Sequence, residues 1–353
     1  MTLNRAMFPW AIHRVLHGRG QSLAEVAVET RELCPEETTS CPPAVYCPGA
    51  LDRVTALSPW RDWETEQVLL EGRSVTHAAS RAVVLRDVVL AGGFLYCKGL
   101  RYPIGLGESQ FNLLNLPSRQ HYEVAHLAMT WSGAYYFGNF LQDNLPLEML
   151  PDSDAPRLGA PGKPMRHAAG YRALLDLPAP DLPVHAAIKE LTLYVDFAQN
   201  SLKAARYAEL RRRMRASLQD SRPDRPAPGI FLMRGTDGES RTLVNEAEVA
   251  SMLAGLGFDI IDPAGMEPAE ISARALDARV VVAVEGSHLA HAIYSLADKG
   301  AFVVIQPPDR FALPYKEYAD RMEMAFGFLV AHPAEGGFRA DLEELKRVLE
   351  LVA

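Results

Sequence analysis

The sequence has little cysteine, no long apolar run and no excess of positive charge. Its 353 residues include four cysteines without a Cys-x-x-Cys pair, so a structural zinc site is disfavoured and free thiols are expected. No apolar run reaches the roughly 18 residues of a membrane helix, and residues 1–20 lack the apolar core of a secretory signal. The net charge of −8 disfavours binding to nucleic acid. These absences predict a cytoplasmic globular protein.

Two cofactor motifs are also missing. No Gly-x-Gly-x-x-Gly follows a predicted strand, because Gly105-Leu-Gly107 lacks the third glycine, and dinucleotide oxidoreduction is therefore disfavoured. No Asp-x-Asp motif lies at a strand end, since Asp152-Ser-Asp154 is in a Pro-rich segment. We expect no resident metal and no cofactor.

The length suits two domains of about 150 residues each. The Pro-rich stretch 223–229 is the best boundary, which divides the chain into domains 1–222 and 223–353. In the first domain, residues 81–97 predict two strands joined by a turn, and residues 191–197 predict another strand. The segment 130–150 has helical spacing, and Pro146 is expected to end or kink that helix.

Residues 203–225 are strongly basic, with eight Lys and Arg against three acids. One interpretation is a helix face exposed to solvent. The other is contact with an anionic membrane surface or an acidic acceptor.

The second domain alternates strands and helices. Continuous apolar runs predict strands at 230–233, 258–261, 280–284, 302–305 and 328–331. Amphipathic segments predict helices at 245–256, 268–278, 288–297, 315–326 and 341–352. This alternation predicts an α/β fold with a doubly wound parallel sheet covered on both faces. Such sheets bind ligands beyond the carboxyl ends of their strands.

One predicted strand end carries the turn Glu285-Gly286-Ser287-His288-Leu289. Ser287 is a good helix N-cap, and Gly286 lets a ligand approach the backbone. Free amides at the start of the helix favour a diphosphate, and His288 could donate to a phosphate oxygen. Many such turns bind nothing, so a purely structural role stays open.

A second predicted strand ends at Arg234, and the polar loop after it carries Arg241. Asn245 is expected to cap the next helix, with Glu246 in its first turn. Two arginines at a strand end form a receptor for anions. A surface loop with ordinary charges is the alternative.

These residues in this order resemble glycosyltransferase family 61, the bacterial capsular-polysaccharide-type group related to plant xylan arabinosyl- and xylosyltransferases and animal O-linked GlcNAc transferases. The resemblance is carried by Arg234, Arg241, the pair Asn245-Glu246, Gly257-Phe258, the 285–289 turn, and Gly138-Asn139-Phe140-Leu141 followed by Asp143. Two residues depart from the family pattern. Glu285 replaces the first histidine of the His-Gly-Ala-Gly-Leu-like turn and should weaken anion binding unless it turns toward a hydroxyl. Asn139 replaces a histidine.

The resemblance implies a two-domain enzyme with two Rossmann-like domains in the GT-B arrangement. Domain 1–222 would be the α/β acceptor side, and domain 223–353 would bind the donor. The implied donor-binding residues are Arg234, Arg241, Asn245, Glu246, Glu285, Gly286, Ser287, His288 and Leu289. Asp143 is the first candidate for the catalytic base, and His126 is the second.

The resemblance also implies a function. A hexosyl or pentosyl group would pass from a nucleotide-sugar, with a UDP-sugar as the first candidate, to a saccharide or glycolipid acceptor in surface or capsular polysaccharide synthesis. The expected mechanism is inverting and independent of metal, and the expected place is the cytoplasm or the inner face of the membrane. Two alternatives remain: a pyruvyl-type polysaccharide-modifying transferase, and a non-catalytic sugar-nucleotide-binding or scaffold protein.

Overall fold

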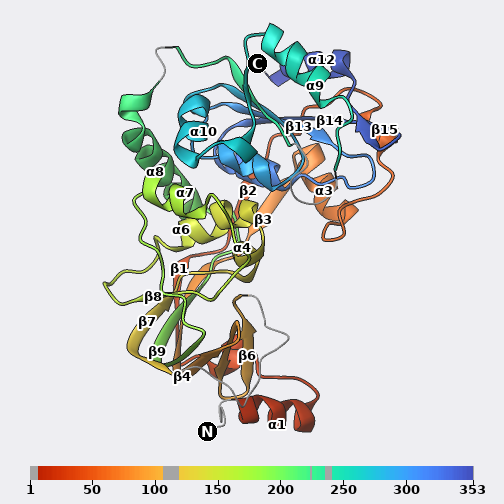
Figure 1. Cartoon of the computed structure of the whole chain (residues 1–353). Helices are drawn as coiled ribbons and strands as arrows, with labels where there is room; N and C mark the ends of the chain where they lie inside the picture. The colour runs from red at the N-terminus through yellow and green to blue at the C-terminus, as the bar shows by residue number, and fades with distance from the viewer. Residues whose placement is uncertain (1–6, 106–118, 223–224, 235–240, 353) are drawn as a thin grey trace. The chain divides into compact units, whose positions relative to one another are not determined.

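The computed structural model describes residues 7–105, 119–222, 225–234 and 241–352 (Figure 1). The chain forms two compact units, and neither is a single stretch of sequence. Unit 1 comprises residues 1–36, 78–172 and 177–198, and unit 2 comprises residues 37–77, 173–176 and 199–353. These units differ from a single division of the chain at residue 222. Whether 1–222 and 223–353 are separate domains stays a prediction.

Unit 2 is built on a five-stranded sheet in which every neighbouring pair is parallel. Its strand order is β11-β10-β12-β13-β14. The strands are β10 (Gly229–Leu232), β11 (Asp259–Ile261), β12 (Val280–Val284), β13 (Ala301–Gln306) and β14 (Ala325–Val330). Buried β-branched and apolar residues fill these strands, as expected of a parallel sheet without a solvent-facing side. The predicted parallel sheet of the C-terminal half is confirmed.

Helices cover both faces of this sheet. They are α9 (Glu246–Gly255), α10 (Pro268–Ala275), α11 (Pro314–Arg321) and α12 (Leu342–Val352). Leu253 of α9 and Val348 of α12 share one buried cluster with Val282 and Val303 of the sheet. On the other face, the ring of Tyr318 in α11 lies edge-on to Phe302, with centroids 5.9 Å apart. The unit is therefore doubly wound.

The predicted helix at 288–297 is wrong in type and length. The structure has a short 3₁₀ helix instead, η5 (Ser287–Ala292). The carbonyls that would continue a helix are bound by side chains from elsewhere: the oxygen of Ile293 accepts from Arg211 and Tyr318, and the oxygen of Leu296 accepts from Arg211. These external donors replace the hydrogen bonds of a longer helix.

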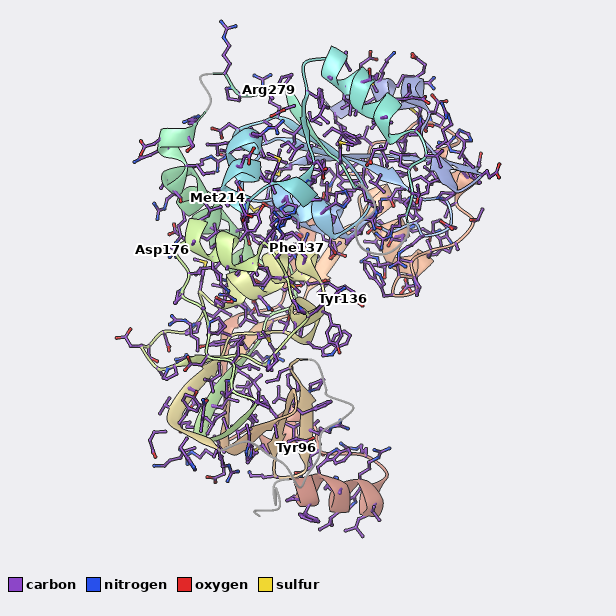
Figure 2. The ribbon with its side chains drawn as sticks, viewed as in Figure 1. Tyr96, Tyr136, Phe137, Asp176, Met214 and Arg279 are labelled. Carbon is purple, nitrogen blue, oxygen red and sulfur yellow. The ribbon has the colours of Figure 1, made fainter. Side chains whose placement is uncertain are left out.

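Tyr318 belongs to α11, and Arg211 belongs to α8 (Ser201–Ser217), which lies in the predicted basic segment. Arg211 is 2% exposed and also binds Asp298, while Arg215 binds Asp277, Asp298 and the carbonyl of Leu296. Met214, labelled in Figure 2, is fully buried on the same helix. The solvent-exposed interpretation is therefore wrong for Arg211, whose charge is used inside unit 2.

Further segments complete unit 2. They are the hairpin β2 (Glu37–Ser40) with β3 (Ser74–His77), η1 (Ala50–Arg53), α3 (Trp63–Glu71), η3 (Gln219–Ser221), η4 (Pro263–Gly265), and the hairpin β15 (His332–Ala334) with β16 (Gly337–Arg339). Val45 forms a parallel bridge with Gly327 of β14, and Arg53 binds Glu344 of α12. Residues 37–77 thus belong to the core of this unit.

Unit 1 holds a seven-stranded mixed sheet with the path β6-β5-β4-β9-β7-β8, and β1 pairs with β4. The strands are β1 (Glu29–Cys34), β4 (Ser80–Ala91), β5 (Phe94–Cys97), β6 (Leu100–Pro103), β7 (Gln120–Leu127), β8 (Arg157–Leu158) and β9 (His185–Val195). Among the described strands of this sheet, β7 pairs in parallel with β8 and β9, and the other paired strands are antiparallel. The expectation of a second Rossmann-like sheet is not met.

The local reason is the turn between β4 and β5. Gly92 and Gly93 both have positive φ, 56° and 77°, which suits a two-residue hairpin turn. Such a turn joins antiparallel strands, whereas parallel neighbours need a long crossover. The predicted pair of strands in 81–97 is confirmed.

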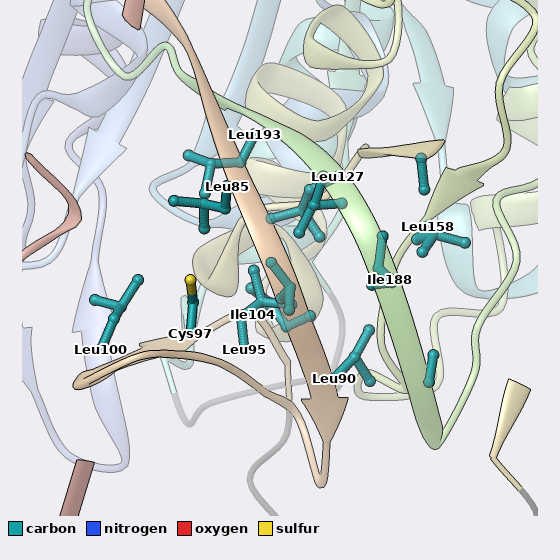
Figure 3. Packing of buried hydrophobic residues seen from close by; sticks show 14 of the residues in the cluster. Leu85, Leu90, Leu95, Cys97, Leu100, Ile104, Leu127, Leu158, Ile188 and Leu193 are labelled. Atoms are coloured by element: carbon teal, nitrogen blue, oxygen red, sulfur yellow. The ribbon is translucent and has the colours of Figure 1, made fainter. Parts of the chain in front are cut away.

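The core of unit 1 lies against β4 and β9. Leu85, Leu127, Ile188 and Leu193 belong to one buried cluster, which Figure 3 shows around these two strands. Small helices accompany the sheet: α1 (Met7–His17), α2 (Leu23–Val26), α4 (Trp131–Tyr135), α5 (Phe137–Asn139), the π-helical turn η2 (Phe140–Asn144) and α6 (Leu145–Leu147). The helix α7 (Ala168–Leu174) runs across the division between the units.

The segment 130–150 is helical but broken. Its π turn ends just before Leu145-Pro146, where the missing N–H of proline interrupts regular bonding. Among the described residues, no helix combines the length and the apolar character that a membrane crossing requires.

Candidate donor site at the switch point of the parallel sheet

The two loops singled out in the sequence follow neighbouring strands, β10 and β12. Leu232 pairs with Ala283 in the parallel register, so Arg234 and Glu285 leave the sheet at the same edge. The sheet continues to β11 on one side of β10 and to β12 on the other. Open parallel sheets bind ligands where the winding reverses in this way. The predicted donor residues therefore lie at the switch point, and the intervening residues 235–240 are outside the described part of the chain.

Arg241 binds Glu285 through both the backbone and the side chain. Its Nη1 donates to the carbonyl oxygen of Glu285 at 2.8 Å and to Oε2 at 2.5 Å. The side chains are only 11% and 6% exposed. A buried pair of this kind holds each partner in place. The carboxylate that replaces the family-type histidine thus compensates one of the two predicted positive charges.

His288 joins the arginines through its ring. Nη1 of Arg234 lies 3.4 Å from Nδ1 of His288, and a guanidinium can only donate, so Nδ1 accepts. Burial, followed by the charges of Arg234 and Arg241, lowers the pKa of His288 to about 3. The ring is neutral at pH 7 and carries its proton on Nε2. That buried N–H has no hydrogen-bond partner among the described residues.

Gly286 makes this convergence possible. Its φ of 153° is one that other residues rarely adopt, and a Cβ there would overlap Nη1 of Arg234. The same atom would come within 3.1 Å of Nη1 of Arg241 and 3.2 Å of Nδ1 of His288. We call Arg234, Arg241, Glu285, Gly286 and His288 the switch-point cluster.

Two other residues predicted to bind the sugar donor, Glu246 and Asn245, bind backbone groups of unit 2. Oε1 of Glu246 accepts from the backbone N–H of Arg234 at 2.7 Å and so fixes the end of β10. Asn245 is the N-cap of α9, as predicted, although its side chain makes no capping bond. The side chain instead pairs with the N–H and the carbonyl oxygen of Ala340, both at 3.0 Å.

The remaining two predicted residues follow the turn. Ser287 is exposed and begins η5, whose N-cap is Gly286 without a side-chain bond, so Ser287 is not the predicted N-cap. Leu289 is fully buried in the core. Neither side chain contributes charge to the cluster.

Tyr315 contacts the turn that follows Gly286, and the sequence did not predict this contact. Its hydroxyl donates to the carbonyl oxygen of Ser287 at 3.4 Å. Burial, and then the charge of Glu285, raises the pKa of Tyr315. Tyr315 lies in an ordinary amphipathic helix pattern, so no local signal marked it.

The first candidate base, Asp143, lies in unit 1 on the π turn η2. Nδ2 of Asn139 donates to Oδ2 of Asp143 at 2.8 Å, one turn away. Asp143 is partly exposed. The residue that replaces the family's histidine thus orients this carboxylate.

The second candidate, His126, is 4% exposed on β7. Its Nδ1 lies 2.9 Å from the hydroxyl of Tyr194, and its Nε2 lies 2.8 Å from the hydroxyl of Ser153. Burial lowers its pKa, so it is neutral at pH 7. Both ring nitrogens are engaged, at one side of a cleft of about 230 Å³ beside the Arg31–Asp152 ion pair.

One group of possible metal ligands occurs in the described part of the chain: His332, Asp341 and Glu344, with ligand atoms within 4.8 Å of one another. Both carboxylate oxygens of Glu344 already accept from Arg53, at 2.7 and 2.6 Å. Asp341 accepts from two backbone amides at the start of α12. These contacts give the group a structural role, and the absence of a resident metal stays a prediction.

Comparison with known families decides what kind of protein carries this cluster. Residues 137–304 match the family Glycosyltransferase 61. The chain carries a glycosyltransferase family 61 domain. The match begins beside the Gly138-Asn139-Phe140-Leu141 motif and ends within β13, so this domain includes Asp143 and the switch-point cluster, whereas His126 precedes it. A glycosyltransferase of this family has a sugar donor and an acceptor. No curated protein matches the chain.

Proposed function

We propose that this glycosyltransferase takes its sugar from a nucleotide-sugar, with a UDP-sugar as the first candidate, and transfers it to a saccharide or glycolipid acceptor in surface or capsular polysaccharide synthesis. The observation that carries the proposal is the switch-point cluster. Two guanidinium groups, and one imidazole N–H without a partner among the described residues, lie at the edge of the sheet where parallel sheets bind ligands, and this supports the proposal.

The cluster suits a departing diphosphate. Negative charge grows on the leaving group as the bond to the sugar breaks, and donors held in place stabilise that charge without reorganising. Arg234 supplies a guanidinium group. The Nε2–H of His288, which has no partner among the described residues, supplies a neutral donor for a phosphate oxygen.

Arg241 is expected to act mainly by position. Its Nη1 binds the carboxylate of Glu285 at 2.5 Å. The same atom donates to the carbonyl oxygen of Glu285 and ties the loop after β10 to the turn after β12. We therefore expect Arg241 to hold these two loops in place, and Arg234 and His288 to contact the diphosphate.

On the acceptor side, we propose Asp143 as the base that removes the proton of the attacking hydroxyl. Asn139 holds one of its oxygens, and a positioned base contributes roughly 10²- to 10⁴-fold in rate. His126 remains second because Tyr194 and Ser153 occupy both of its nitrogens. A single displacement would invert the anomeric carbon and need no metal. Unit 1 would then serve the acceptor, the division of labour of GT-B enzymes, without a second Rossmann-like sheet.

The test is calorimetric titration of the full chain with UDP and UDP-sugars. We expect Arg234→Ala to weaken UDP binding at least about 100-fold, which corresponds to the loss of one charged donor. The control is Arg339→Ala, because the side chain of Arg339 on β16 is 52% exposed and binds Glu248, which lies outside the switch-point cluster. Equal affinity of the wild type and Arg234→Ala would refute the proposed site.

Two results would favour the other functions. Transfer from phosphoenolpyruvate, without turnover of any nucleotide-sugar, would indicate a pyruvyl-type transferase. Tight UDP-sugar binding without turnover, unchanged by Asp143→Asn, would indicate a non-catalytic binding or scaffold protein.

A further inference from the structure

The helix α1 (Met7–His17) presents an apolar stripe to solvent. Phe8, Ile12, Val15 and Leu16 are 50%, 57%, 84% and 70% exposed. Their spacing places all four on one face of a helix. Single exposed apolar residues are ordinary, but four in register on one short helix form a patch that calls for a partner.

The opposite face of α1 is anchored to unit 1. The guanidinium of Arg101 on β6 lies 5.0 Å from the ring of Trp10, and the same group lies 3.8 Å from the ring of Phe94 on β5. Nδ1 of His13 is 2.8 Å from the carbonyl oxygen of Arg19 just after the helix. Figure 1 shows α1 beside this edge of unit 1. The helix is therefore held with its apolar stripe outward.

The charge around the stripe is of one sign. Residues 7–24 contain Arg14 and Arg19 and no acidic residue, in a chain whose net charge is −8. Arg19 is paired with Glu25, whereas Arg14 lies over Trp10 with no acidic partner among the described residues. A local basic region next to an apolar stripe is the pattern of helices that lie in a membrane interface.

We propose that α1 docks unit 1 onto an anionic lipid bilayer. Phe8, Ile12, Val15 and Leu16 would enter the boundary between headgroups and acyl chains, and the basic groups would meet anionic headgroups. A second copy of the chain is the weaker occupant, because a stable dimer buries about 800 Å² per partner, and one stripe on an 11-residue helix offers much less.

This inference is independent of the donor site. It agrees with a glycolipid acceptor, but bilayer binding needs neither UDP nor transfer. The basic segment on α8 does not enter this argument: Arg211 is buried within unit 2, and Arg212 and Arg213 are both paired with Glu209.

The test is co-sedimentation of the full chain with vesicles. We expect binding to vesicles of phosphatidylcholine mixed with phosphatidylglycerol, weaker binding to phosphatidylcholine alone, and a decrease with added salt. The variant Ile12→Glu/Leu16→Glu should lose at least about tenfold in partitioning, because two of the four inserting side chains become charged. Its UDP affinity and thermal unfolding should match the wild type.

The matched control is Leu256→Glu/Leu351→Glu, since these leucines of unit 2 are 50% and 60% exposed. It should bind vesicles as the wild type does. Vesicle binding unaffected by the α1 variant, or equal for neutral and anionic vesicles, would overturn the proposal. Absence of vesicle binding would also overturn the proposal. If light scattering then showed self-association that the α1 variant abolishes, the occupant of the stripe would be a second copy of the chain.

Discussion

A neutral histidine between two arginines is the chemical centre of the switch-point cluster. His288 has a pKa of about 3 because it is buried and because Arg234 and Arg241 lie beside it. An unfolded histidine has a pKa of about 6.5. Between about pH 6.5 and pH 3, His288 therefore binds a proton in the unfolded chain but stays neutral in the folded protein.

This difference makes stability depend on pH. The contribution of His288 is complete above about pH 6.5 and is lost as the pH falls toward 3, because the unfolded state binds the proton first. We expect the free energy of unfolding of the wild type to fall with acidification faster than that of His288→Gln, by up to about 1.4 kcal/mol per pH unit. Urea unfolding at several pH values between about 7 and 4 measures both slopes. Parallel slopes would show that His288 is not held neutral.

Glu285 sets the charge of the same cluster. Glu285→Gln removes the carboxylate 2.5 Å from Arg241 while keeping its size. We expect UDP to bind about tenfold more tightly at low salt, since the cluster loses a negative charge that opposes the diphosphate, and tenfold corresponds to about 1.4 kcal/mol. The unliganded variant should unfold at a lower temperature, because the buried guanidinium of Arg241 has lost a charged partner. Calorimetry and thermal unfolding would show both; weaker UDP binding would mean that Glu285 itself contacts the donor.

At the scale of elements, α8 determines the shape of the segment after the turn. Arg211 binds the carbonyl oxygens of Ile293 and Leu296 at 2.9 and 2.6 Å, together with Asp298. These contacts hold η5 and the residues after it in a short 3₁₀ turn instead of a helix.

Removing this contact should be costly. We expect Arg211→Met to lower the free energy of unfolding by about 3 kcal/mol, since the carbonyl oxygens of Ile293 and Leu296 each lose one of two donors, the charged one from Arg211. Arg212→Met is the control on the same helix, because Arg212 is 67% exposed and its partner Glu209 is on the same helix, and it should change stability by less than about 0.5 kcal/mol. Denaturant unfolding compares the two. A small effect at Arg211 would mean that η5 is held by its own packing.

The element scale also explains what could be predicted from the sequence. The strands β10 to β14 were predictable because each is a local run of buried apolar residues. The hairpin of β4 and β5 was predictable because Gly92-Gly93 separates two apolar runs. The 3₁₀ helix η5 was not predictable, because the contact from Arg211 comes from α8, some eighty residues earlier in the chain. The convergence of Arg234, Arg241 and Glu285 was predictable from their strand ends, whereas Tyr315 was not.

At the scale of the whole molecule, each unit is assembled from separate stretches of chain. Unit 2 takes residues 37–77 from the N-terminal half, including Arg53, which binds Glu344, and Val45, which bridges to Gly327. Such long-range pairings leave no periodic signal in one segment. This is why the Pro-rich stretch at 223–229 was the visible boundary.

A fragment of residues 223–353 should therefore not fold alone. It lacks α8, which supplies Arg211 and Arg215 to the segment after the turn, and it lacks the partner of Glu344. We expect circular dichroism of this fragment to show no cooperative thermal unfolding, unlike the full chain. A cooperative transition would instead support an independent C-terminal domain.

The most direct measurement is a crystal structure of the full chain with UDP. We expect diphosphate oxygens within hydrogen-bonding distance of the guanidinium of Arg234 and of Nε2 of His288, beside Gly286. A nucleotide bound at another place, or a diphosphate that touches neither group, would contradict the assignment of the switch-point cluster as the donor site.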